Sequence, residues 1–133
     1  LGPAGTAHMS LMDLGRYVQE HLALYQGTSE IWSGEAFATL YELPDSDPPY
    51  AAGWFVHEHN PIVDGPFVHH NGSNGYWLAK TGFAPDQNLA FFCASNYLDR
   101  GQADVVCRRL FQHIANFPPL LEKAEALESQ STQ

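Results

Sequence analysis

Positive charge is scarce in this chain of 133 residues: Lys and Arg number 6 against 15 Asp and Glu, which gives a formal net charge of -9. Nucleic acids and anionic membranes are bound through basic surfaces, so we expect neither as a partner. No apolar run reaches the ~20 residues that a membrane span needs. The first residues also lack the basic-then-apolar pattern of a signal peptide, which leaves the compartment open between periplasm and cytoplasm.

Cysteine is scarce too. Cys93 and Cys107 are the 2 cysteines, too few for a disulfide scaffold or a zinc ribbon. We interpret both as buried free thiols, with a single disulfide between them as the alternative. By contrast, 44% of the residues are hydrophobic, 13% are aromatic and only 16% are charged. This composition and length predict one folded globular domain.

Helical periodicity comes first along the chain. Ser10, with Asp13 three residues later, predicts the N-cap of an amphipathic helix over residues 11–26. Ser33 is expected to cap a second, shorter helix. Three prolines within residues 43–49 then predict a surface loop, so residues 1–45 are interpreted as helices followed by a Pro-rich loop.

The apolar period changes to two from residue 50 onward. This change predicts short strands at 50–59, 66–72, 76–83 and 88–96, and their short connections make neighbours antiparallel. The last strand is apolar on both faces, which requires a cover on each. A helix over residues 102–116 is the evident cover for one face, and only the first helix is available for the other. Residues 118–133 are expected to form a tail. The sequence thus predicts an α+β fold with an antiparallel sheet of about four strands.

The candidate site is the segment from Phe67 to Trp77, in which His70 and Asn71 precede Gly72 and Ser73. Glycine removes side-chain bulk, so a ligand or another backbone can approach an exposed strand edge closely. The polar groups of His70, Asn71 and Ser73 would point at whatever approaches. The alternative is a plain hairpin turn in which the two Asn-Gly pairs of this segment supply positive φ angles.

Several segments together resemble the C-terminal part of the penicillin-recognising serine hydrolases, which are the class C β-lactamases, the D-alanyl-D-alanine carboxypeptidases and related esterases. The matching segments span roughly residues 3–116 and are Pro3-Ala4-Gly5, Ser10-Leu11-Met12-Asp13-Leu14, His70-Asn71-Gly72, Pro85-Asp86 and Asn96. His70-Asn71-Gly72 stands where the family has Lys-Thr-Gly or His-x-Gly. Lys80-Thr81-Gly82 spells the family triplet literally, but it leaves no room for the two strands that follow the triplet in the family.

The resemblance implies a β-lactamase-like fold and a small-molecule ester or amide substrate, as for an esterase, amidase or D-amino-acid peptidase. It implies that His70, Asn71 and Gly72 bind substrate and that the backbone N–H of Ser73 is an oxyanion donor. The family's Ser-x-x-Lys and Tyr-x-Asn are absent from the sequence, so no catalytic residue is assigned and the chain is expected to be catalytically incomplete alone. Its expected partner is the N-terminal part of its own domain, or a second copy. No cofactor is expected.

Two other interpretations stay open. The chain is either a non-catalytic binding module of the same fold or a small metal-binding protein built on hairpin histidines. His57 and His59 share one strand face, and the adjacent His69 and His70 lie across the hairpin. Strand geometry places the two pairs about 8 Å or more apart, which argues against a shared metal. The other histidines, including His21, are expected on the surface or on helix faces.

Overall fold

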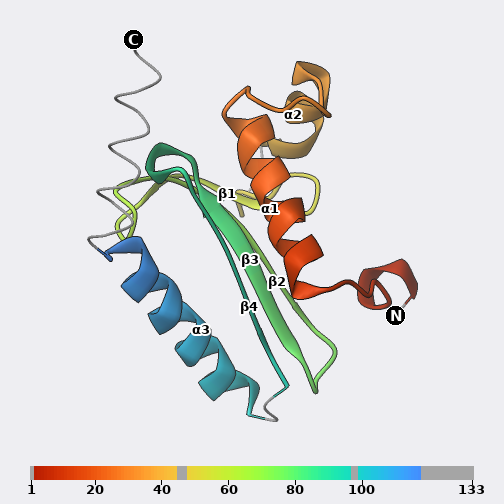
Figure 1. Cartoon of the computed structure of the whole chain (residues 1–133), viewed down its shortest axis with the longest axis vertical. Coiled ribbons are helices and arrows are strands. Elements are labelled where there is room, and N and C mark those ends of the chain that lie inside the picture. Colours follow the sequence, from red (N-terminus) through yellow and green to blue (C-terminus); the bar gives the residue numbers. More distant parts are fainter. Residues whose placement is uncertain (1, 45–47, 97–98, 118–133) are drawn as a thin grey trace.

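A four-stranded antiparallel sheet lies between two helices in the computed structural model, which describes residues 2–44, 48–96 and 99–117 (Figure 1). Each strand pairs with the next along the chain, in the order β1 (Phe55–Asn60), β2 (Gly65–Ser73), β3 (Leu78–Ala84) and β4 (Leu89–Ser95). The α+β prediction and the antiparallel sheet are confirmed. The expected tail falls outside the described residues.

Helices α1 (Leu11–Tyr25) and α3 (Arg100–Ala115) cover opposite faces of this sheet, and α2 (Gly34–Tyr41) packs beside α1 (Figure 1). Short 3-10 turns at Gly2–Gly5 and Pro85–Gln87 complete the regular structure. Both long helices contact β3 and β4, so β4 is covered on each face. The two apolar faces of β4 are thus covered within the chain, so they give no reason to expect a second copy or another part of the domain as the cover. None of the helices described is both long and apolar enough to cross a bilayer.

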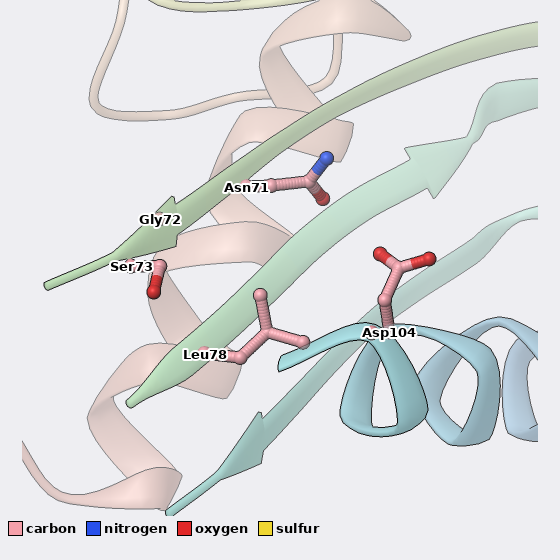
Figure 2. Close-up of a pocket in the computed structure, with 6 residues that line it drawn as sticks. Asn71, Gly72, Ser73, Leu78 and Asp104 are labelled. Atoms are coloured by element: carbon pink, nitrogen blue, oxygen red, sulfur yellow. The ribbon is translucent and has the colours of Figure 1, made fainter. Parts of the chain in front are cut away.

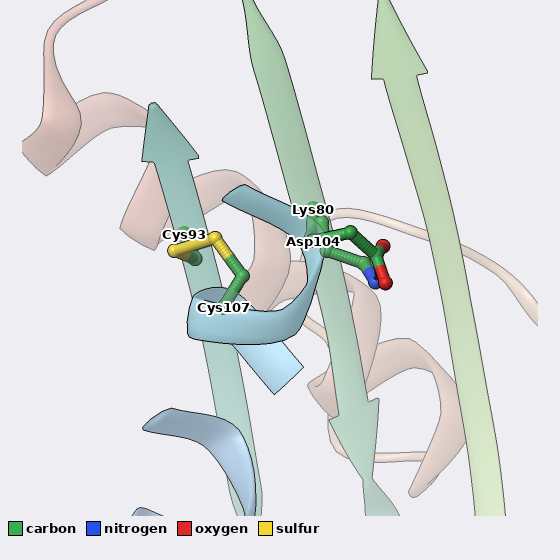
Figure 3. The surroundings of a disulfide bond; sticks show 4 residues. All are labelled: Lys80, Cys93, Asp104 and Cys107. Carbon is green, nitrogen blue, oxygen red and sulfur yellow. Dashed lines mark hydrogen bonds and ion pairs between the residues drawn. A yellow bond between two sulfur atoms is a disulfide. The ribbon is translucent and has the colours of Figure 1, made fainter. Parts of the chain in front are cut away.

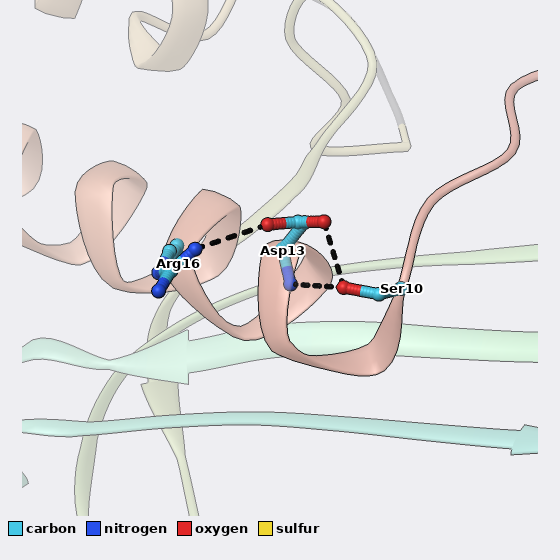
Figure 4. Close-up of polar contacts among 3 residues, drawn as sticks. All are labelled: Ser10, Asp13 and Arg16. Carbon is cyan, nitrogen blue, oxygen red and sulfur yellow. Dashed lines mark hydrogen bonds and ion pairs between the residues drawn. The ribbon is translucent and has the colours of Figure 1, made fainter.

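The N-terminus of α1 is capped as the sequence predicts. The Ser10 hydroxyl accepts a hydrogen bond from the backbone N–H of Asp13 at 3.1 Å and donates one to the Asp13 carboxylate at 2.7 Å (Figure 4). Arg16 pairs with the same carboxylate at 3.1 Å. A serine cap contributes about 1 kcal/mol, whereas an exposed ion pair contributes little. Ser33 also precedes its helix, but its side chain makes no capping hydrogen bond.

The larger core fills the space between α1, α2 and the sheet. Val18 and Leu22 of α1 meet Val68 and Phe83 of the central strands. His21 is also buried here, where its Nδ1 is hydrogen-bonded to the hydroxyl of Tyr41 of α2, and burial lowers its pKa. His21 was expected on the surface or on a helix face. It lies on a face of α1, but on the inward face, so the expectation of a surface position is wrong.

The expectation of free thiols is also wrong. Cys93 of β4 and Cys107 of α3 form a disulfide with a Cα–Cα distance of 5.7 Å (Figure 3). Side chains alternate along a strand, which points Cys93 at α3. The inward stripe of α3 places Cys107 directly opposite. The spacing of the two cysteines in the sequence does not predict that they meet, because their distance depends on where α3 crosses the sheet.

Element ends differ from the predictions by a few residues. β1 begins at Phe55 instead of residue 50, because the chain first makes a turn in which Gly53 has a φ of 96°. β3 begins at Leu78 instead of residue 76. α3 begins at Arg100, two residues early, since the Asp99 carboxylate accepts a hydrogen bond from the Gln102 N–H at 3.0 Å and caps the helix there.

Candidate functional site

The predicted site residues lie at the end of β2, beyond the part that β1 pairs. Register pairs between β1 and β2 end at Phe55 opposite His69, whereas β2 stays paired with β3 as far as Ser73 opposite Leu78. Among the strands that the structure describes, residues 70–73 therefore have a partner on one side only. We call these four residues the open edge. The expectation of an exposed strand edge is confirmed here.

The competing interpretation, a hairpin turn, holds for the second Asn-Gly pair. Gly75 has a φ of 94°, and the Asn74 side chain accepts hydrogen bonds from the backbone N–H groups of Tyr76 at 3.1 Å and Trp77 at 3.0 Å. Asn71 and Gly72 instead continue β2. The turn that follows the open edge is thus held by its own side chains and leaves the edge extended.

Asn71 and Ser73 line a hollow on the side of the sheet that α3 covers (Figure 2). Its volume is about 540 Å³, and Gly72, Leu78, Gly101 and Asp104 complete its lining. His70 is not among the lining residues. Because strand side chains alternate, His70 lies on the opposite face of the sheet. The structure therefore brings three of the four predicted site residues to one hollow and separates the fourth.

Tyr50 is the residue that holds His70 in place. Its hydroxyl lies 3.0 Å from the His70 Nε2, and the two ring centroids are 5.8 Å apart. Tyr50 belongs to the loop before β1, where it makes an isolated bridge to Phe55. No signal in the sequence points to this contact, because it depends on how that loop folds back over β2.

Lys80 has a structural partner within the chain. Its ammonium lies 2.5 Å from the Asp104 carboxylate of α3 (Figure 3). This hydrogen bond, with the charge of Lys80, lowers the pKa of Asp104 although partial burial acts in the opposite direction. Lys80 of the Lys-Thr-Gly triplet thus ties the sheet to α3. The role of Gly82 in the triplet is close packing against β2 and β4.

Gly82→Ala tests that close packing. A Cβ at this position would lie 2.7 Å from the Val68 carbonyl oxygen and 2.8 Å from a ring carbon of Phe91. We expect the free energy of unfolding to fall by about 1–3 kcal/mol, because the carbonyl belongs to the β2 backbone and cannot yield freely. Urea denaturation with a far-ultraviolet circular dichroism signal measures the change.

Gly72→Ala is the matched control, since a Cβ at Gly72 meets nothing within 4 Å. Its stability should stay within about 0.5 kcal/mol of the parent chain. Equal stability of the two variants would contradict the close packing at Gly82.

Two histidines lie closer together than strand geometry suggested. His57 Nε2 and His69 Nε2 are 3.2 Å apart, so the expected separation of about 8 Å is wrong for this pair. His57 stands opposite Phe67 and His69 stands opposite Phe55, which makes the histidines diagonal neighbours on one face. Burial, with the nearby positive charges, lowers the pKa of His69 to about 4. Among the described residues no three His, Cys, Asp or Glu side chains form a metal cluster.

No family model, curated protein or solved structure matches this chain. The fold and the site define an α+β domain in which an antiparallel meander presents the open edge at residues 70–73 beside a polar hollow.

Proposed function

We propose that this chain is the C-terminal part of a β-lactamase-related serine hydrolase, with a β-lactamase-like fold and an ester or amide substrate. The observation that carries the proposal is the open edge, whose backbone has a strand partner on one side only. An extended substrate can add to such an edge through main-chain hydrogen bonds, as peptides do when they join an exposed sheet.

A substrate paired with the edge lies between the two faces of the sheet, so side chains from both faces reach it. His70 approaches from the side of α1, and its ring is already oriented by the Tyr50 hydroxyl. Asn71 and Ser73 approach from the hollow on the side of α3. Gly72 leaves the space that the substrate backbone needs, and the Ser73 N–H stabilises the developing oxyanion. His70 in place of the family's lysine removes a fixed positive charge, which favours an esterase, amidase or D-amino-acid peptidase activity over a β-lactamase activity.

The partner under this assignment is an N-terminal part of the same domain, which carries the nucleophile, its base and the tyrosine. A strand of this N-terminal part could pair with the outer edge of β4. β4 is the other edge of the sheet and runs for 7 residues, LAFFCAS, without a charged side chain. Long uncharged edges are templates for strand addition. Pairing of two copies through this edge is the alternative, and sedimentation equilibrium distinguishes the two.

Complementation tests the proposal. The chain alone should not react with a fluorophosphonate probe, because no serine has a lysine three residues later. Mixing it with an N-terminal segment that carries Ser-x-x-Lys and Tyr-x-Asn should give labelling of that segment's serine and hydrolysis of p-nitrophenyl esters. Gly72→Val in this chain should then reduce hydrolysis at least tenfold by blocking the edge.

Gly34→Ala is the control for that substitution, since Gly34 also has nothing within 4 Å of its added Cβ and begins α2 far along the chain from the open edge. Labelling of a serine in the isolated chain would contradict the division of roles. A complemented domain that binds ester analogues without hydrolysing them would favour the binding-module interpretation instead.

A further inference from the structure

His57 of β1 and His69 of β2 form a pair that has no part in the proposed hydrolase. Their rings are nearly parallel, at 9°, and their Nε2 atoms face each other at 3.2 Å. Two aromatic neighbours contact His69, with centroid distances of 5.3 Å to Phe55 and 5.2 Å to Phe67. Both histidines are half-buried. The pair is therefore held in place by its surroundings and keeps some access to solvent.

The separation of the two nitrogens fits two ligands of one metal ion. Nitrogens bound at ~2.0–2.1 Å lie about 2.9 Å apart at a right angle and about 3.4 Å apart at the tetrahedral angle. The Nε2–Nε2 distance of 3.2 Å lies between these limits. An N–H···N hydrogen bond has a similar length, so the same geometry suits the metal-free pair.

Lys80 is the permanent cation that acts on His69, and the Asp104 carboxylate balances its charge at 2.5 Å. His70 also acts on His69, although alternation of side chains along β2 places it on the other face of the sheet. The separation of the two Nε2 atoms, and not the charge around them, is what favours a metal.

We propose that His57 and His69 form a two-histidine site for a late first-row divalent metal, with Cu²⁺ bound more tightly than Ni²⁺ or Zn²⁺. Both rings must present an Nε2 lone pair. The proton shared between the rings therefore moves to Nδ1 of the ring that carried it, and no proton need be released. Because the described residues include no cluster of three ligating side chains, water fills the remaining positions. This site is independent of the proposed hydrolase function.

Titration of the full chain with Cu²⁺ in a non-coordinating buffer tests the site. Electron paramagnetic resonance should show one ion per chain with hyperfine coupling to two nitrogens. His57→Ala and His69→Ala should each weaken binding at least tenfold in a chelator competition assay. His59→Ala is the matched control, because His59 is the next histidine of β1 and its Nε2 lies 4.0 Å from the Asp64 carboxylate instead of facing His69. The affinity of the His59→Ala variant for Cu²⁺ should equal that of the parent chain.

His69→Gln keeps much of the side-chain volume and is the second variant if the alanine change unfolds the protein, which circular dichroism detects. Binding unchanged in folded His57 and His69 variants would overturn the proposal. So would loss of binding in His59→Ala, or a spectrum with one nitrogen ligand. A chain that binds no Cu²⁺ at tenfold molar excess would leave the pair as a hydrogen bond only and would overturn the proposal as well.

Discussion

Replacing Phe83 by alanine should lower the free energy of unfolding by about 3–5 kcal/mol, the range for large aromatic truncations in a core. Phe83 is 0% exposed and is surrounded by the rings of Tyr25, Tyr41 and Trp54, with centroid distances of 5.6, 5.9 and 5.8 Å. Tyr25 belongs to α1, Tyr41 belongs to α2 and Trp54 directly precedes β1. The cavity left by the alanine would therefore lie where three parts of the fold meet. The free energy of unfolding of a whole native domain is only about 5–15 kcal/mol. Urea denaturation should show a large fall in the midpoint.

Phe117→Ala makes the same chemical change at a residue that is 42% exposed, beyond the end of α3. We expect it to cost less than about 1 kcal/mol. A similar loss in both variants would mean that Phe83 is not the centre of the core.

Removal of the disulfide should destabilise the chain by about 3 kcal/mol, the entropic value for a closed loop of about 15 residues. Cys93 and Cys107 are separated by 14 positions, and the bond ties α3 to β4. The expected result for a Cys93→Ser, Cys107→Ser double variant is a lower melting temperature and faster hydrogen exchange in α3. The amides of β3 should be affected less, because β2 and β4 pair this strand on both sides along most of its length.

Dithiothreitol provides the control for this prediction. It should lower the melting temperature of the parent chain. The melting temperature of the double variant should not change, because that variant lacks the bond. The same melting temperature with and without reductant, in a parent chain whose mass shows the oxidised form, would contradict the stabilising role. Free thiols in the folded parent chain would contradict the bond itself.

The site shows why neighbouring residues in sequence do not make a site by themselves. His69 and His70 are adjacent, yet strand alternation sends them to opposite faces of the sheet. His69 meets His57, whereas His70 meets Tyr50. The sequence places His70, Asn71 and Ser73 within four residues, and the family resemblance groups them as one site. The structure keeps Asn71 and Ser73 together in the hollow and leaves only the backbone edge common to all three.

Local patterns were enough to determine the elements of this protein. The Ser10 cap, the helical stripe that follows it and the period-two strands are signals within a few residues, and the short connections then imply the antiparallel order. The exposed strand end and turn within residues 67–77 were also predicted locally, because Gly72, Gly75 and two Asn-Gly pairs lie in that segment. Each of these features depends on interactions between near neighbours in the chain.

Tertiary structure alone decided which distant side chains meet. The covering of β4 by α1, the Cys93–Cys107 disulfide and the His57–His69 pair all depend on where one element crosses another. Shifting a strand register by one residue would send every side chain of that strand to the other face. The packing of Phe83 and the fit of Gly82 against β2 fix that register. Such contacts are set by the packing of the whole domain, and no single segment of sequence contains them.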